Sequence, residues 1–145
     1  MERHPSPADE VLAQAAVRAA ETDPVLNELN AVLDADPLYQ QVCAKLDRLE
    51  GEARAGEVLL RVLLVKYLYD WSEQQTAEQV QDSLVLRWFC RLGMQPAPTI
   101  RNVSQGASQV PTAVLEELAN LVEQAVERAQ KSEGRLRPTY RERWR

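Results

Sequence analysis

"LLRVLLVKYLYDWSEQQTAEQVQDSLVLRWFCRLG", residues 59–93, decides the fold of this chain. Its first part is apolar on nearly every side of a helix, and such a helix lies in the centre of a bundle. The polar residues in and beside this part are few: Glu57, Arg61, Lys66 and Asp70. Glu57 and Arg61 form an i,i+4 pair in the favourable order, which contributes only a few tenths of a kcal/mol.

Two joints interrupt the same stretch. Ser72 and Gln75 have the spacing of a capping box, which predicts a helix start directly after Trp71. Asp82 or Ser83 restarts a helix, and Gly93 is expected to end it. The outline is that of a helix-turn-helix segment, although many three-helix bundles share it.

The rest of the chain is also helical in pattern. Residues 8–20 are rich in alanine and predict a marginal helix. Asp-Pro pairs at 23–24 and 36–37 are helix starts, because Asp caps and Pro suits the first helical position. After the extended connector "MQPAPT", Thr99 caps a short helix that Gly106 weakens, and Pro111 restarts a long amphipathic helix that ends near Ser132.

These patterns predict an all-α protein, a multi-helix bundle with a helix-turn-helix-like segment and a long C-terminal amphipathic helix. No strand alternation is visible. The expected organisation is a mobile or weakly helical lead at 1–24, a helical domain at 25–130, and a basic tail without regular structure at 131–145. A chain of 145 residues is enough for one such domain with a real core.

Charge is unevenly distributed along the chain, whose net charge is -5. Residues 1–53 hold eleven acids and four bases, whereas the rest holds thirteen bases and eleven acids. The last fifteen residues hold six bases and two acids. An acidic total argues against non-specific coating of nucleic acid, but a locally basic surface can still meet phosphate. A solvated charged tail explains the same residues.

The residue inventory disfavours catalysis and metal binding. Cys43 and Cys90 are far apart, and the single histidine, His4, cannot join them in a four-ligand site. No nucleophile with a base and no glycine-rich phosphate loop are present. We therefore expect no catalytic residue, cofactor, metal or small-molecule substrate. With reduced, packed thiols and an apolar run too short to span a bilayer, we expect a cytoplasmic protein without a membrane partner.

Trp88, Phe89 and Cys90 cover almost a full helical turn, so they cannot all face one core. One interpretation is that the two aromatic rings pack against the central helix while the thiol fills a gap. The alternative is an aromatic contact with another domain or subunit. Tyr67 and Trp71, in the central apolar segment, are core or interface candidates for the same reason.

The basic and polar candidates for DNA contact lie further along. Arg87 and Arg91 are spaced i,i+4, which predicts a common face that meets either phosphate or water. Hydrogen-bond donors recur at the start of the next helix. The full set of DNA-contact candidates is Arg87, Arg91, Arg101, Asn102, Arg135 and Arg137.

The stretch 59–93 resembles the N-terminal domain of bacterial insertion-sequence transposases of the DDE type, the InsH-like group. The resemblance rests on the apolar "LL…LL…YLY" helix, the "WS" joint at 71–72, the run "DSLVLRWFCRL" at 82–92, and Pro98 in the connector. The upstream "DPLYQQVCAKL" is similar to the segment that precedes this motif, so the likeness covers roughly residues 25 to 137.

Two departures from that family's pattern change what the resemblance implies. "TIRNVSQGASQV" replaces the family's usual Asp and Ser/Thr-Thr-Leu helix start. After Arg137, Pro138 and Thr139 stand where a strand residue and the first catalytic Asp of the family are expected. None of the three catalytic carboxylates maps onto this sequence, so the resemblance implies a transposase module truncated before its nuclease, and no enzyme.

The resemblance predicts a module that binds the terminal inverted repeats of an element or assembles the transposase, in the bacterial cytosol or on the nucleoid. The alternative is a helical interaction module that self-associates, or that pairs with full-length transposase and inhibits it. A decayed fragment without a role is a third reading, which the ending "RPTYRERWR" favours.

Overall fold

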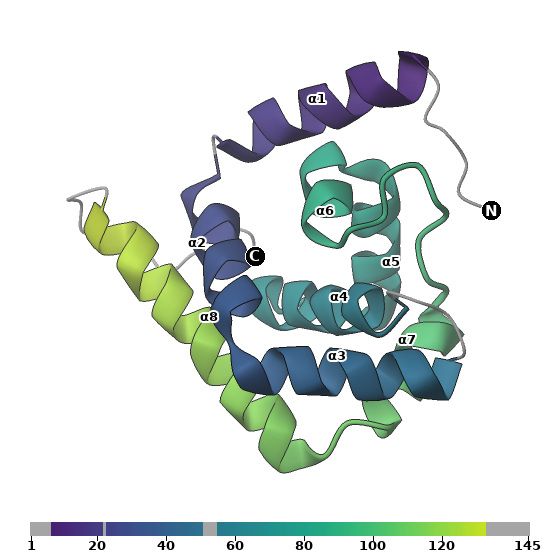
Figure 1. Ribbon diagram of the computed structural model, residues 1–145, viewed down its shortest axis with the longest axis vertical. Coiled ribbons are helices and arrows are strands. Elements are labelled where there is room, and N and C mark those ends of the chain that lie inside the picture. The colour runs from purple at the N-terminus through teal and green to yellow at the C-terminus, as the bar shows by residue number, and fades with distance from the viewer. Residues whose placement is uncertain (1–6, 22, 51–54, 133–145) are drawn as a thin grey trace.

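The structure is a computed structural model that describes residues 7–21, 23–50 and 55–132 (Figure 1). Within these ranges every regular element is a helix, which confirms the all-α prediction. The helices are α1 (Pro7–Glu21), α2 (Pro24–Ala35), α3 (Pro37–Glu50), α4 (Ala55–Tyr69), α5 (Glu73–Asp82), α6 (Leu84–Phe89), α7 (Ile100–Ser108) and α8 (Thr112–Ser132).

Local capping chemistry explains where these helices begin. The Asp23 carboxylate accepts the Leu26 N–H at 3.0 Å, and the Asp36 carboxylate accepts the Tyr39 N–H at 2.8 Å. Each replaces a hydrogen bond that a helix start cannot make internally. The capping box predicted at Ser72 is present in full. Ser83 is the cap of α6, since its hydroxyl accepts the Leu86 N–H.

Helix α4 lies in the middle of the bundle, as its all-round apolar pattern predicts (Figure 1). Helices α3, α5, α7 and α8 all pack against it, and α2 packs along α8. The α3–α4 approach is close, because a Cβ at Gly56 would stand 2.6 Å from the Leu46 Cβ. The backbone N–H of Gly56 also donates to the Asp47 carboxylate at 2.7 Å. α4 is thereby fixed against α3 from its first turn.

Two helices end next to a left-handed residue. Asp70 (φ 57°) directly follows α4, which stops at Tyr69, and Arg91 (φ 63°) is the second residue after α6, which stops at Phe89. In both, the next N–H reaches five residues back along the chain, as in a Schellman motif: Trp71 to Lys66 at 3.1 Å and Leu92 to Arg87 at 3.0 Å. Gly93 also has a positive φ but lies beyond the end of α6, so its predicted role as the helix stop was wrong.

The two ends of the described chain differ in burial. α8 is the predicted long amphipathic helix, and it buries Leu118, Val122, Ala125, Val126 and Ala129. α1 packs across α6, yet no side chain described in α1 is buried. The basic tail predicted at 131–145 lies almost wholly outside the described residues. The joint between α5 and α6 is the single residue Ser83, so a helix-turn-helix geometry is not confirmed.

Candidate functional site

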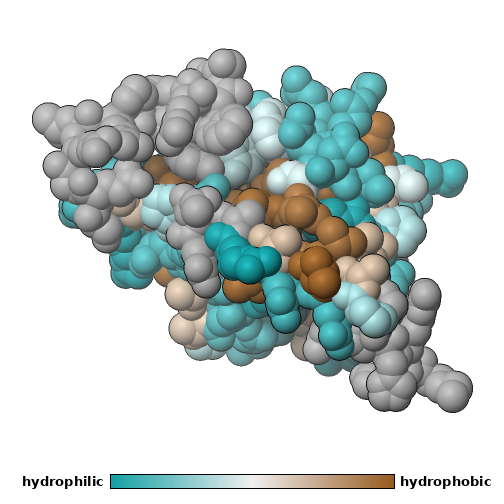
Figure 2. Space-filling model, turned by 90° about the horizontal axis from the view of Figure 1, so that it is seen from above, coloured by the Kyte–Doolittle hydropathy of each residue, from teal (hydrophilic) through white to brown (hydrophobic). Residues whose placement is uncertain are grey.

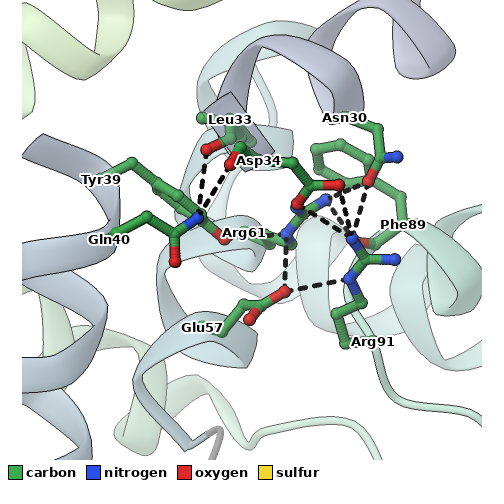
Figure 3. A network of polar contacts seen from close by, with 9 residues as sticks. All are labelled: Asn30, Leu33, Asp34, Tyr39, Gln40, Glu57, Arg61, Phe89 and Arg91. Carbon is green, nitrogen blue, oxygen red and sulfur yellow. Dashed lines mark hydrogen bonds and ion pairs between the residues drawn. The ribbon is translucent and has the colours of Figure 1, made fainter. Parts of the chain in front are cut away.

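Arg61, in the middle of α4, is completely buried and is the centre of a polar network (Figure 3). Its Nε donates to the Tyr39 hydroxyl at 2.8 Å, and its Nη1 donates to Asn30 Oδ1 at 2.8 Å and to the Phe89 carbonyl at 3.1 Å. Its Nη2 pairs with Asp34 at 3.1 Å. A buried charge is tolerated only when it is paired and hydrogen-bonded, and here the whole guanidinium is used.

Arg91 brings a second guanidinium to the same carboxylates. Its Nε donates to Glu57 at 2.9 Å, and its Nη2 donates to Asn30 at 3.1 Å and to Asp34 at 3.2 Å. Burial alone would lower the pKa of Arg91, but the hydrogen bond to Glu57 and the charge of Asp34 outweigh burial and raise its pKa. These contacts hold Arg91 in the left-handed conformation that its backbone adopts.

The network therefore joins α2, α3, α4 and the end of α6. The expected Glu57–Arg61 pair is present at 3.3 Å, and its arginine lies in the core. On its outer side the network borders an open polar depression of about 340 Å³, which is lined by Asp34, Gln40, Glu57 and Arg91. Among the described residues no buried side-chain polar atom lacks a partner. The arrangement holds four helices together.

Arg87 is also turned inward, with only 7% of its surface exposed. Its Nε donates to the Gly93 carbonyl at 3.0 Å, and its Nη1 donates to the Gln81 carbonyl at 2.9 Å. Its Nη2 donates to the carbonyl of Gln95. α6 ends before Arg91, so the predicted common face of Arg87 and Arg91 does not exist. Both arginines are engaged with the protein itself.

The aromatic core or interface candidates, and Cys90 beside them, differ in how deeply they are buried. Phe89 and Cys90 are completely buried, and the Arg61 guanidinium lies 4.9 Å from the centre of the Phe89 ring. Trp88 is partly buried against the core. Trp71 stacks on Tyr69, with ring centres 4.3 Å apart.

Tyr67 faces outward, with 38% of its surface exposed. Its hydroxyl donates to Glu123 of α8 at 3.1 Å, which ties the last turn of α4 to the C-terminal helix.

Helix α7 presents the remaining candidates. Its inner face packs on α4 through Val103 and Gly106, whereas Arg101 and Asn102 are exposed in its first turn. The chain has 22 acidic residues, yet none lies between positions 83 and 115, which include all of α7. The outer face is thus acid-free and rich in hydrogen-bonding groups: Thr99, Arg101, Asn102, Gln105, Ser108 and Gln109. Sequence reasoning missed this pattern, although the residues show it.

One carboxylate from another element does reach α7. Glu73, in the first turn of α5, accepts the hydroxyl proton of Ser104, and it is partly buried there. α7 lies at the opposite end of the bundle from α1 (Figure 1). Arg135 and Arg137, the other predicted DNA contacts, are outside the described residues.

Neither thiol is placed for chemistry. Burial raises the pKa of Cys43 to about 11 and that of Cys90 to about 12. In the described ranges no three His, Cys, Asp or Glu side chains gather closely enough to hold a metal ion. Over the same ranges, none of the helices has the length and apolar character needed to cross a bilayer.

The domain is an all-α bundle with a buried arginine network and an acid-free helix at one end. The transposase domain family DUF772 matches residues 15–105, which is more than half of the chain. The chain belongs to this transposase domain family. No curated protein and no solved structure matches it.

Proposed function

We propose that this transposase-related domain binds duplex DNA through the outer face of α7. The observation that carries the proposal is the absence of acidic residues from positions 83 to 115 in a chain that is otherwise strongly acidic. DNA carries a dense array of phosphate charges, so a bound duplex is repelled least at an acid-free edge. Membership of a transposase family makes DNA the polyanion that fits.

The exposed side chains of α7 suit both parts of a DNA contact. Arg101 supplies a cation for phosphate, and Asn102 supplies an amide that pairs with a base edge or a sugar. Gln105 is exposed one turn further on, so the three groups follow one side of the helix. Arg87 and Arg91 are left out of this surface, because their guanidinium groups are bonded inside the domain.

Fluorescence anisotropy with labelled duplexes from the DNA that flanks the coding sequence tests the proposal. Binding should weaken as salt is added, since phosphate contacts release counterions. Arg101→Ala should weaken binding to all duplexes and lower the salt slope by about 1. Asn102→Ala should reduce the preference for flanking over scrambled duplexes.

Arg18→Ala is the matched control, because Arg18 is an exposed arginine on α1 at the other end of the bundle. It should leave the affinity unchanged. Equal losses from Arg18→Ala and Arg101→Ala would place the contact elsewhere. A wild-type domain that binds no duplex at low salt would refute the proposal.

The proposal assigns DNA contact and not strand cleavage to these residues. A supercoiled plasmid incubated with the domain and Mg²⁺ should stay uncut while it is bound. Nicking by the purified domain would overturn this assignment.

The localisation of the protein follows from the same proposal, since element DNA lies in the bacterial cytosol and nucleoid.

A second candidate function is assembly with another transposase copy. It is favoured by exposed apolar side chains where α1 crosses α6: Val11 is 61% exposed, Val17 43% and Leu84 38%. Viewed from the α1 side, Figure 2 shows apolar residues gathered in the middle of this face and hydrophilic residues around them. Burial of this face against another copy would remove apolar surface from water.

Light scattering over a range of protein concentrations tests the assembly function. Val11→Asp together with Val17→Asp should shift any oligomer to monomer, and Arg18→Ala, on the same helix, should not. A monomer at all concentrations, alone and with intact transposase, would refute it. DNA binding through α7 would be unaffected by that result.

A further inference from the structure

We infer that Arg87 and Gln81 are positioning residues that aim the first turn of α7 at DNA, an inference that rests on the DNA-binding function proposed above. Neither side chain belongs to the acid-free face itself. Both bind the connector, residues 93–99, that leads from the end of α6 into α7. The inference assigns the orientation of the contact surface to residues that do not themselves touch the duplex.

The connector has few means of holding its own shape. It contains Pro96 and Pro98, which have no N–H, so Ala97 supplies the one backbone donor between them. The side-chain carbonyl of Gln81 accepts that donor at 3.0 Å. Arg87 holds the preceding part by donating to the carbonyls of Gly93 and Gln95.

Both anchors are fixed at the joint between α5 and α6. The Nη1 of Arg87 donates to the backbone carbonyl of Gln81 at 2.9 Å, so the Arg87 guanidinium is held next to the residue whose side chain binds Ala97. Arg87 is buried, and a planar guanidinium with several donors fixes the relative directions of its acceptors. The α5–α6 joint and the connector therefore move as one body.

The connector in turn sets the start of α7. Thr99 is the N-cap, and its hydroxyl accepts the Asn102 N–H at 3.1 Å. The buried residues Val103, Gly106 and Val110 all follow the first turn, as does Ser104, which bonds to Glu73. The exposed first turn, with Arg101 and Asn102, is the part of α7 that directly follows the connector.

The first measurement needs no DNA. Hydrogen exchange of the amides from Ala97 to Asn102 should be faster in Gln81→Met than in wild type, because the acceptor of Ala97 is gone while the shape of the side chain is kept. Gln81 is exposed, so the melting temperature should hardly change. Arg87→Lys should have the same effect, since one ammonium cannot reach three separated carbonyls. Unchanged exchange in both variants would overturn the inference.

The second measurement couples the anchors to DNA. Gln81→Met should weaken duplex binding by about 2- to 10-fold, the range expected for one lost hydrogen bond, without changing the salt slope. In a double-mutant cycle with Arg101→Ala the losses should be less than additive, since both act through the same contact. Additive losses would overturn the inference, as would full affinity in Gln81→Met while Arg101→Ala binds weakly.

Failure of the DNA-binding function gives a different result from failure of the inference. If the wild-type domain binds no duplex, the proposed function and its positioning residues both fall, whatever the exchange rates are. If the wild type binds and Arg101→Ala weakens it, the function stands. In that case only the behaviour of Gln81→Met and Arg87→Lys decides whether α7 is positioned by these residues.

Discussion

Arginine rarely lies in the interior of a protein, and two of the arginines that the structure describes, Arg61 and Arg87, are nearly or fully buried. They use the same planar fork in different ways. Arg61 joins side chains from α2, α3 and α4 to the backbone of α6, whereas Arg87 binds only backbone carbonyls of one connector and one helix end. Lysine cannot replace either, because it offers a point charge without a fixed fork.

Loss of Arg61 should be among the most destabilising single changes in the domain. Arg61→Met keeps the length of the side chain but removes the donor of the buried Tyr39 hydroxyl and of the Phe89 carbonyl, whereas Asn30 and Asp34 keep Arg91. Each buried polar group left without a partner costs about 1–3 kcal/mol of unfolding free energy. Urea denaturation measures this loss.

Arg128→Met is the matched control for that experiment. Arg128 pairs with Glu28 at 3.7 Å on the surface, with 58% of its side chain exposed. An exposed pair of this kind contributes about 0–1 kcal/mol. Similar losses in the two variants would mean that the network around Arg61 contributes no more than a surface ion pair.

The buried thiols should make the domain lose stability in alkali. Burial raises the folded-state pKa of Cys90 to about 12, from 9.0 for an unperturbed thiol. Between these values the unfolded chain releases a proton that the folded chain keeps. The free energy of unfolding should therefore be unaffected below pH 9.0 and should fall above it, by about 1.4 kcal/mol per pH unit for this group.

Denaturation curves for wild type and Cys90→Ala, below and above the ordinary thiol pKa, check this prediction. The variant should be less stable at neutral pH because it leaves a cavity, yet its stability should fall less steeply with pH. Burial raises the pKa of Cys43 to about 11, so the variant should retain some alkaline loss. Parallel pH profiles would contradict the assignment to Cys90.

At the scale of helices, the α3–α4 crossing depends on the absence of a side chain at Gly56. A Cβ there would overlap the carbonyl oxygen of Cys43 and stand 2.6 Å from the Leu46 Cβ, so helix backbones would have to separate. Gly56→Ala should lower the unfolding free energy by about 1–3 kcal/mol, the usual cost of overpacking. Thermal or urea unfolding measures the change.

Gly106 provides the control for Gly56, since it is also a buried helical glycine. Its added Cβ would be 3.2 Å from Leu59 Cδ1, which is the end of a flexible side chain. Gly106→Ala should therefore be nearly neutral, because better helix propensity offsets the small displacement of Leu59. A larger loss for Gly106→Ala than for Gly56→Ala would contradict the packing described here.

Helix starts were predictable from the sequence, whereas helix ends were not. Asp23, Asp36, Ser72 and Ser83 act within three residues of themselves, so the local sequence carries the whole signal. The end of α6 depends on Arg91 in a left-handed conformation, held by Glu57 and Asp34 from other helices. No local sequence pattern indicates partners that come from other helices. The local pattern instead predicted that the helix would end at Gly93.

The same limit explains why the surroundings of some candidate residues were predicted incorrectly from the sequence. An arginine within an amphipathic pattern is normally exposed, so Arg87 and Arg91 were expected on an outer face. Only the folded chain brings Gly93 and Gln95 back to Arg87. A lone arginine among the apolar residues of α4 was a signal for a buried partner at Arg61, but the sequence did not say which acid would supply it.

Over the whole molecule, charge and burial are both distributed unevenly. The acid-free residues 83–115 include α7 at one end of the bundle and the connector that leads to it from α6. Such an arrangement orients the molecule in the field of a polyanion before contact. At the other end, α1 covers α6 with exposed apolar residues and adds nothing to the described core.

Removal of residues 1–22 should therefore leave the fold intact. The melting temperature should fall by only a few degrees, and the DNA affinity should be unchanged. Removal of residues 112–145 is the comparison, and it should abolish cooperative unfolding because α8 supplies Leu118, Val122 and Ala125 to the core. Circular dichroism melts distinguish the two. Loss of the cooperative melt on removal of α1 would contradict this division.

Ser83 belongs to two helices at once, since its N–H closes α5 onto Gln79 and its hydroxyl opens α6 at Leu86. Neither helix can fray at this point without loosening the other. A local opening that starts at the joint must spread in both directions, and Arg87 extends it into the connector. Residues 73–97 are thus expected to unfold and refold as one cooperative unit, a foldon. Its smallest unfolding reaction would involve both helices and the connector together.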